Sequence, residues 1–207
     1  MDDKLDQIIK ISAGLFVKYG IRSVSMDDVA REMGMSKKTL YLYLNNKTDL
    51  VEKILEYHLK NRCCYGDFIT GKKLNAIDIL LEVSKEVSKN FQNFNPAVMY
   101  DLQKYYPEIF KNYMHKHMDI IQDHVIQNIE QGIEEGLYRD DLSVELIARL
   151  YLKKLEAIHQ PEFLHNNEFN FKVIFEVMFE SHIRGIANKK GVKYLEKQKK
   201  TFNFNIG

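Results

Sequence analysis

The chain has 207 residues, of which 45% are hydrophobic and 29% charged, proportions that exclude a disordered protein and fit a folded globular one. Thirty Lys and Arg against 29 Asp and Glu leave a net charge of +1, so any site for a polyanion must be local. Two adjacent cysteines give no disulfide framework, and the acidic N-terminus and the lack of a long apolar run predict neither signal peptide nor membrane span, so we expect a cytoplasmic protein.

Apolar residues recur at helical spacing along most of the chain, and no alternating β-strand pattern interrupts them, which predicts an all-α fold of about nine helices. In the first part, Gly20 and Gly34 each end a helix, and Ser25 with Asp28 forms a capping box at the start of the second helix. Ser36 can cap a third. We expect helices over residues 5–20, 25–34, 36–45 and 46–65.

The helices beyond residues 66–73 are expected to be longer. Pro96 and Pro107 mark where two of them begin, because the residue before a proline disfavours the α conformation. We expect helices over about 74–94, 96–106, 107–136, 143–159 and 168–190. The segment from Lys189 to Lys200 holds six lysines against Glu196, a charge of +5, and we expect a solvated, partly disordered tail. A second nucleic-acid contact there has no further support in the sequence.

Residues 34–50, GMSKKTLYLYLNNKTDL, gather lysines and tyrosines and contain no acid before Asp49. Two short helices joined by a glycine turn after a longer one are typical of a helix-turn-helix, whose second helix enters the DNA major groove. Leu40 and Leu44 would face the core, which turns the polar residues between them outward. Lys37 and Lys38 oppose the dipole at the start of their own helix, which favours an anionic partner. A surface helix with solvated lysines is the alternative.

A set of residues at fixed spacing carries a family resemblance: Phe16, Gly20, Ser25, Val29-Ala30, Gly34-Met35-Ser36, Thr39-Leu40-Tyr41, Tyr43, Lys47 and Leu50. Residues 5–55 resemble the DNA-binding domain of the tetracycline-repressor (TetR) family of bacterial regulators. The resemblance implies a transcriptional repressor that binds palindromic operator DNA as a homodimer. It implies that Tyr41, Tyr43 and Lys47 clamp phosphates, often with Thr39, and that Lys37 and Lys38 read bases. The DNA-binding residues predicted in this way are Ser25, Lys37, Lys38, Thr39, Tyr41, Tyr43 and Lys47.

Two positions depart from the pattern of the family. Leu44 stands where phenylalanine is usual and can keep the core role, whereas Leu42 stands where a polar or aromatic residue is usual and removes one possible DNA contact. Asp27 and Asp28 favour the dipole of the second helix, but they would repel a phosphate placed close to them.

The resemblance further implies a DNA-binding domain over residues 1–46 and a helical ligand-binding and dimerisation domain over 47–190, connected by the helix that starts at 47; residues 191–207 form the basic tail. Methionines and aromatics make adaptable apolar walls, so we expect an apolar or amphipathic effector, with plain core packing as the alternative. The candidate ligand-binding residues are Phe91, Phe94, Met99, Tyr100, Phe110, Tyr113, Met114 and Met118. The candidate dimerisation residues are Tyr151, Leu155, Phe171, Phe175, Met178, Phe179 and His182.

Two rival classes of function stay open. A helical small-molecule-binding protein or enzyme without DNA-reading function would need catalytic residues that meet from afar, because the sequence shows no nucleophile–base pair, Gly-rich phosphate loop or metal motif. A helical protein that only dimerises would not need the basic segment. We predict no cofactor, no metal and no membrane partner; His115 and His117 lie on different faces of a helix, which makes a shared metal ion unfavourable.

Overall fold

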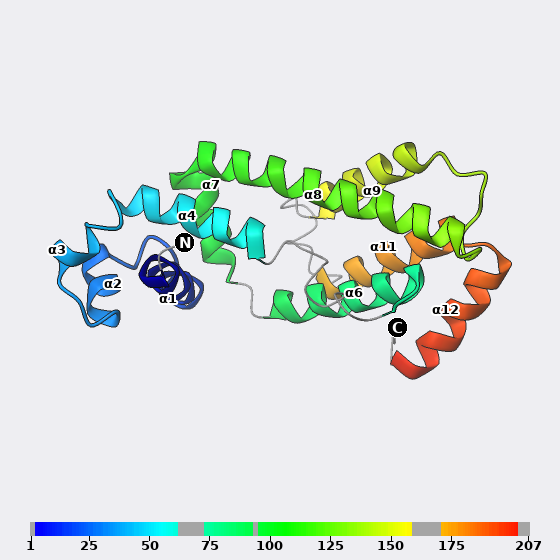
Figure 1. Cartoon of the computed structure of the whole chain (residues 1–207), viewed down its shortest axis with the longest axis horizontal. Helices are drawn as coiled ribbons and strands as arrows, with labels where there is room; N and C mark the ends of the chain where they lie inside the picture. The colour runs from blue at the N-terminus through cyan, green and yellow to red at the C-terminus, as the bar shows by residue number, and fades with distance from the viewer. Residues whose placement is uncertain (1–2, 62–72, 93–94, 159–170, 203–207) are drawn as a thin grey trace. The chain divides into compact units, whose positions relative to one another are not determined.

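The computed structural model describes residues 3–61, 73–92, 95–158 and 171–202 (Figure 1). Within them the chain forms ten α-helices and no strand, which confirms the all-α prediction. No helix in these ranges is both long enough and apolar enough to cross a lipid bilayer. The helices are α1 (Asp3–Tyr19), α2 (Met26–Glu32), α3 (Lys37–Leu40), α4 (Lys47–Asn61), α6 (Ala76–Gln92), α7 (Pro96–Tyr105), α8 (Pro107–Glu134), α9 (Val144–Ile158), α11 (Phe171–Ile186) and α12 (Lys189–Phe202).

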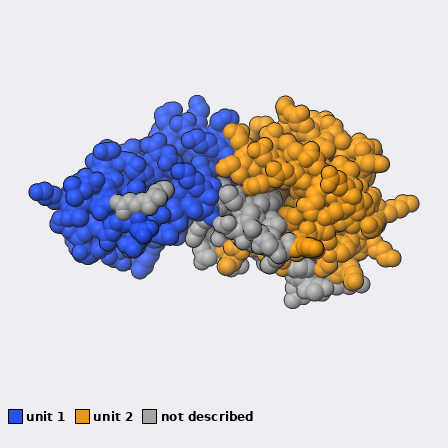
Figure 2. Space-filling model, in the orientation of Figure 1, with its two compact units in different colours: residues 1–64, 93–117 blue, residues 65–92, 118–207 orange. Residues whose placement is uncertain are grey.

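The chain divides into two compact units, each with its own hydrophobic core (Figure 2). The first unit comprises residues 1–64 and 93–117, and the second comprises residues 65–92 and 118–207. The unit that contains the predicted helix-turn-helix is thus larger than residues 1–46, because it includes α4, α7 and the start of α8. The functional division at residue 46 stays a prediction.

The local signals of the first unit act as expected at the start of α2. The Ser25 hydroxyl accepts the backbone N–H of Asp28 at 3.1 Å, and the Asp28 carboxylate accepts the backbone N–H of Ser25 at 2.9 Å. This reciprocal capping satisfies two backbone donors that the first turn of a helix leaves unpaired. The core of the unit also includes Leu102 from α7, with Phe110 from α8 packed against it.

The third helix is shorter than predicted, because α3 ends at Leu40 rather than near residue 45. After it, the backbone N–H groups of Leu42 and Tyr43 donate to carbonyls three residues back, at 3.2 and 3.1 Å, which tightens the chain into a turn. The side-chain pattern survives this change, since Leu40 and Leu44 are both buried in the core.

The second unit packs α6, the later part of α8, α9, α11 and α12 around one core. A buried side chain of α8, Asn128, links α8 to two other parts of this unit. Its amide donates to the Ala76 carbonyl at the start of α6 at 2.8 Å, and it accepts from the Tyr138 hydroxyl at 3.1 Å. Gly132 lies directly under the ring of Tyr138, where a Cβ atom would come within 2.1 Å of a ring carbon. No larger residue fits there without moving the ring.

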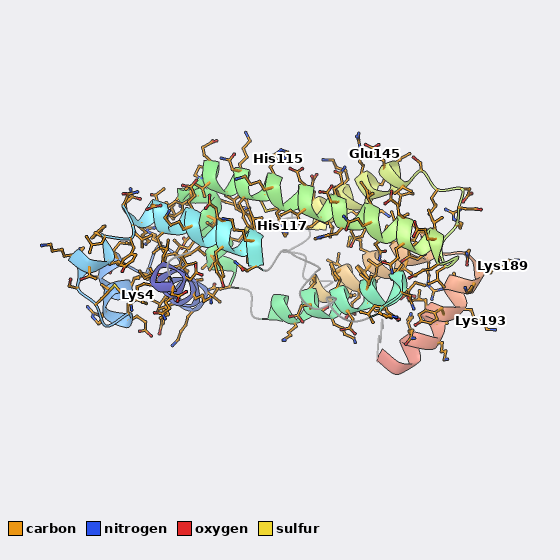
Figure 3. All side chains as sticks on the ribbon, in the orientation of Figure 1. Lys4, His115, His117, Glu145, Lys189 and Lys193 are labelled. Atoms are coloured by element: carbon orange, nitrogen blue, oxygen red, sulfur yellow. The ribbon has the colours of Figure 1, made fainter. Side chains whose placement is uncertain are left out.

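The C-terminal part differs from the predicted long helix and disordered tail. The helix ends at Ile186, and Asn188 caps a new helix. The Asn188 side chain accepts the backbone N–H groups of Lys190 and Gly191 at 2.9 and 3.0 Å. Leu195 of α12 is buried in the core, and Lys199 pairs with Glu180 of α11 at 2.7 Å. Lys189 and Lys193 lie on the exposed side of α12 (Figure 3). Residues 191–202 are therefore a docked helix, and 203–207 lie outside the described residues.

Candidate nucleic-acid interface

A glycine turn joins the two short helices of the first unit. Gly34 has a φ of +62°, a left-handed conformation that costs glycine little, and Met35 donates its backbone N–H to the carbonyl of Ala30 at 2.9 Å. Val29 and Ala30 of α2 and Leu40 of α3 are buried in the same core. The two helices are thereby held as a helix-turn-helix, and the opposite side of α3 faces outward.

The outward side of α3 carries both lysines predicted to read bases. Lys37 and Lys38 are exposed, and the ammonium of Lys37 lies 3.0 Å from the carboxylate of Asp27. This contact raises the pKa of Lys37, so the side chain is charged at neutral pH. Since both partners are exposed, the pair is weak and a phosphate or a base edge can replace the carboxylate. The surface charge here is lower than the lysines alone suggest.

Lys47, at the first position of α4, is held in a partly buried place. Its ammonium lies 3.5 Å from the carbonyl oxygen of Arg22 and 5.9 Å from the centre of the Phe16 ring. Burial lowers the pKa of Lys47, while the nearby carboxylates of Asp101 and Asp28 act in the opposite direction. A partly buried cation at the start of a helix is well placed to bind a phosphate, because the backbone N–H groups of a first turn attract the same anion.

The Ser25 hydroxyl makes a hydrogen bond that was not predicted from the sequence. Its hydroxyl donates to the Asp28 carboxylate at 2.6 Å, and the hydrogen bonds from Ser25 lower the pKa of Asp28. The single hydroxyl proton is therefore committed to the cap, and in this geometry Ser25 has no donor left for a phosphate. Its predicted DNA contact stays a prediction and would need the cap to rearrange.

The remaining predicted contacts lie on α3 and in the turn that follows it. Tyr41 is exposed, whereas Tyr43 is half-buried and packs against the core of the first unit. The hydroxyl of Thr39 lies 2.8 Å from that of Ser36, the residue that caps α3. Lysine ammonium groups and tyrosine hydroxyls near one another can donate to phosphates. The arrangement offers hydrogen-bond donors and cations to an anionic partner.

One pair of long-range hydrogen bonds in this unit could not be predicted from the sequence. The backbone N–H of Arg22 donates to the Asp101 carboxylate at 2.8 Å, and its guanidinium donates to the Tyr105 hydroxyl at 2.7 Å. Gly20 lies beside this contact, and its φ of +82° is a left-handed conformation that favours glycine. The turn before α2 is thus fixed to α7, more than 75 residues away in sequence.

Comparison with known proteins decides the identity of this element. Residues 8–54, which include the glycine turn and all seven predicted DNA contacts, match the family described as bacterial regulatory proteins, tetR family. The chain belongs to the tetR family. This tetR-family chain is a DNA-binding transcriptional regulator, and the alternative of a helical enzyme or binding protein without DNA reading is not favoured.

Relatives of this tetR-family chain match it over most of its length. A protein named fatty acid metabolism regulator protein, from Bacillus subtilis, is 22% identical over 90% of this chain and 97% of its own. The HTH-type transcriptional repressor KstR2 of Mycobacterium tuberculosis is 22% identical over 72% of this chain and 76% of its own. A solved transcriptional regulator from Cytophaga hutchinsonii has the same fold, with a TM-score of 0.75 at 20% identity, covering 90% of this chain and all of that one.

The structure does not gather the predicted ligand-binding residues into one described pocket. Phe110 packs against the core of the first unit and Met118 against that of the second, while Tyr100 is exposed. The Tyr113 hydroxyl lies 2.9 Å from Nδ1 of His58. Met99 and Met114 are half-buried; Phe94 and the side chain of Phe91 lie outside the described residues. A recess between α6, α11 and α12 has room for about one water molecule, and none of the eight residues lines it.

The predicted dimerisation residues of this tetR-family protein lie mostly inside the second unit. The described ones are buried in the core of the second unit: Tyr151, Leu155, Phe175, Met178, Phe179 and His182. The side chain of Phe171 lies outside the described residues. Side chains already buried within one chain leave little surface for a second copy, but their role in a dimer stays a prediction. A dimer formed by these helices has to use their other faces.

Proposed function

We propose that this tetR-family regulator is a repressor that binds a palindromic operator as a homodimer and releases it when an apolar or amphipathic small molecule binds. The observation that carries the proposal is the helix-turn-helix with exposed Lys37, Lys38 and Tyr41 around a buried Leu40. One relative is named a transcriptional repressor, and a solved relative is named a ketosteroid transcriptional regulator. Another is named for fatty acid metabolism. These names support repression and an apolar effector.

The two parts of the chain have different roles in the proposed function. Residues 1–46 read the operator, with Lys37 and Lys38 toward base edges and Tyr41 and Tyr43 toward phosphates. Lys47, the first residue of α4, adds a further phosphate contact. The helices within 47–190 bind the effector and the second copy. Phosphate contacts fix the register of a protein on DNA, and base contacts specify the sequence. The effector acts by favouring a dimer geometry in which the two reading helices no longer fit successive half-sites.

The exposed apolar residues of α9 and α11 supply the proposed dimer surface. Leu146 is 56% exposed and Leu150, one helical turn later, is 51% exposed; Val177 on α11 is 48% exposed. Leu146 and Leu150 form a stripe on the side of α9 opposite the buried Tyr151 and Leu155. Paired apolar stripes on helices are favoured interfaces for a second copy, because they remove apolar surface from water.

A chain with Leu146→Glu and Leu150→Glu should be monomeric at concentrations where the parent is a dimer. Two like charges per copy would face each other across the interface, while both positions are exposed and tolerate glutamate in the isolated chain. Light scattering after size-exclusion chromatography gives the mass. Val17→Glu places the same charge on an exposed apolar position of α1 and should leave the dimer intact. If the double variant is still a dimer, the interface lies elsewhere on the chain.

The function is tested by selecting bound duplexes from a random DNA pool with the full-length protein, at two salt concentrations. We expect enrichment of a palindrome whose half-sites lie one helical turn apart, and an affinity that falls steeply as salt rises. The enriched duplex then serves as the probe for compounds that release it. Weak binding without any enriched sequence, from protein freed of bound small molecules by unfolding and refolding, would contradict the proposal.

A further inference from the structure

The reading element exposes one apolar side chain that the proposed contacts do not use. Leu42 is 77% exposed, more than any other large hydrophobic residue in the described part of the chain. Leu40 and Leu44, two positions away on either side, are 0% and 2% exposed. Identical side chains in one short segment thus have opposite burial, and the fold of the free protein gives Leu42 no apolar neighbourhood.

Leu42 lies in the middle of the proposed DNA contacts. It lies between Tyr43 and the exposed Tyr41, the residue that caps the C-terminus of α3. Its backbone N–H donates to the Thr39 carbonyl at 3.2 Å. The turn therefore holds Leu42 in place. An isobutyl group there has no donor or acceptor with which to bind a phosphate, and covering a phosphate with it would remove water without replacing a hydrogen bond.

The major groove offers one apolar group that such a side chain can recognise. Every base edge there carries hydrogen-bond donors or acceptors, and only thymine adds a C5-methyl group. We propose that Leu42 contacts the C5-methyl of a thymine at one fixed position in each half-site, so that this residue specifies thymine by apolar contact. The inference rests on the proposed function, and it adds a base specificity that the lysines and tyrosines do not supply.

Deoxyuridine tests this contact directly, because it differs from thymidine only by the missing methyl group. In the selected operator, each thymine is replaced singly by deoxyuridine, and the affinity of the full-length parent is measured. We expect one symmetric pair of positions at which each replacement weakens binding about fourfold, the effect of removing one buried methyl-sized group. At the same positions, 5-methylcytosine should bind better than cytosine.

The Leu42→Ala variant assigns the effect to the residue. Its affinity for the thymine operator should be lower than that of the parent. Its affinity for the uracil operator should equal the parent's affinity for the same duplex. The variant should therefore bind the thymine and uracil operators equally well. Val17→Ala shortens another exposed apolar side chain of the same unit and should keep the parent's pattern. Thermal unfolding should not distinguish the variants, since both positions are exposed.

The outcomes separate this inference from the function on which it rests. If the parent enriches no sequence, the repressor proposal fails and the thymine contact fails with it. If the parent binds its operator but tolerates uracil at every position, or if Leu42→Ala retains the full penalty, the regulator stands and the thymine contact is overturned.

Discussion

A chain that carries both Tyr43→Phe and Lys47→Gln should bind its operator about 1000-fold more weakly than the parent. A dimer would lose two phosphate contacts in each copy, and each hydrogen bond to a charged group contributes about 1 kcal/mol or more. The loss of two lysine–phosphate contacts should also reduce the slope of log affinity against log salt by about 1.8. The ring at position 43 is retained because it packs against the core of the first unit.

The chain offers a matched control for this double change. The ammonium of Lys10 lies 5.8 Å from the centre of the Tyr57 ring, in the same unit but away from the reading element. Lys10→Gln with Tyr57→Phe removes one cation and one phenolic hydroxyl, as the test variant does, and should keep both affinity and salt slope. Fluorescence anisotropy on the selected duplex measures both. Parent-like binding by the Tyr43 and Lys47 double variant would contradict the assigned contacts.

The stability of the second unit should fall by about 2 kcal/mol between pH 7.5 and pH 5 because of His182 alone. His182 is 7% exposed, and its ring lies 4.3 Å from that of Tyr151. Burial lowers the pKa of His182 from 6.5 to about 4, and the Lys154 cation acts in the same direction. Between these two values the unfolded chain binds a proton that the folded chain does not, so stability is lost as pH falls from 6.5 toward 4.

Urea unfolding of the parent and of His182→Phe, at several pH values, measures this contribution. The phenylalanine keeps an aromatic ring beside Tyr151 and cannot titrate, so its free energy of unfolding should vary less with pH than that of the parent. Equal pH dependence in the parent and His182→Phe would mean that the buried imidazole does not control acid stability.

The parts of the fold that the sequence predicted depend on local chemistry. Ser25 with Asp28, the left-handed Gly34 and the buried Leu40 each act through residues within a few positions, so their roles follow from spacing alone. The tie from Arg22 to Asp101 could not be predicted, because nothing near either residue indicates a partner that lies 79 positions away.

The faces of α9 and α11 that pack inside the chain could not be predicted, for a different physical reason. Helices α9 and α11 carry apolar residues on more than one face, and the sequence does not tell which face packs inside the chain. The larger side chains, such as Phe179, fill the core, and the smaller exposed stripe at Leu146 and Leu150 remains outside. Likewise, the many lysines of α12 concealed the few apolar residues, Leu195 above all, that dock it.

The docked C-terminal helix also changes the meaning of the near-neutral net charge. Residues 189–200 contribute six lysines and one glutamate, or +5, so the rest of the chain carries −4 against a total of +1. Because Leu195 is buried, the cationic side chains of α12 are fixed to the folded surface. This helix thereby sets the sign of the protein's net charge, and net charge affects how fast a protein and a polyanion such as DNA approach each other.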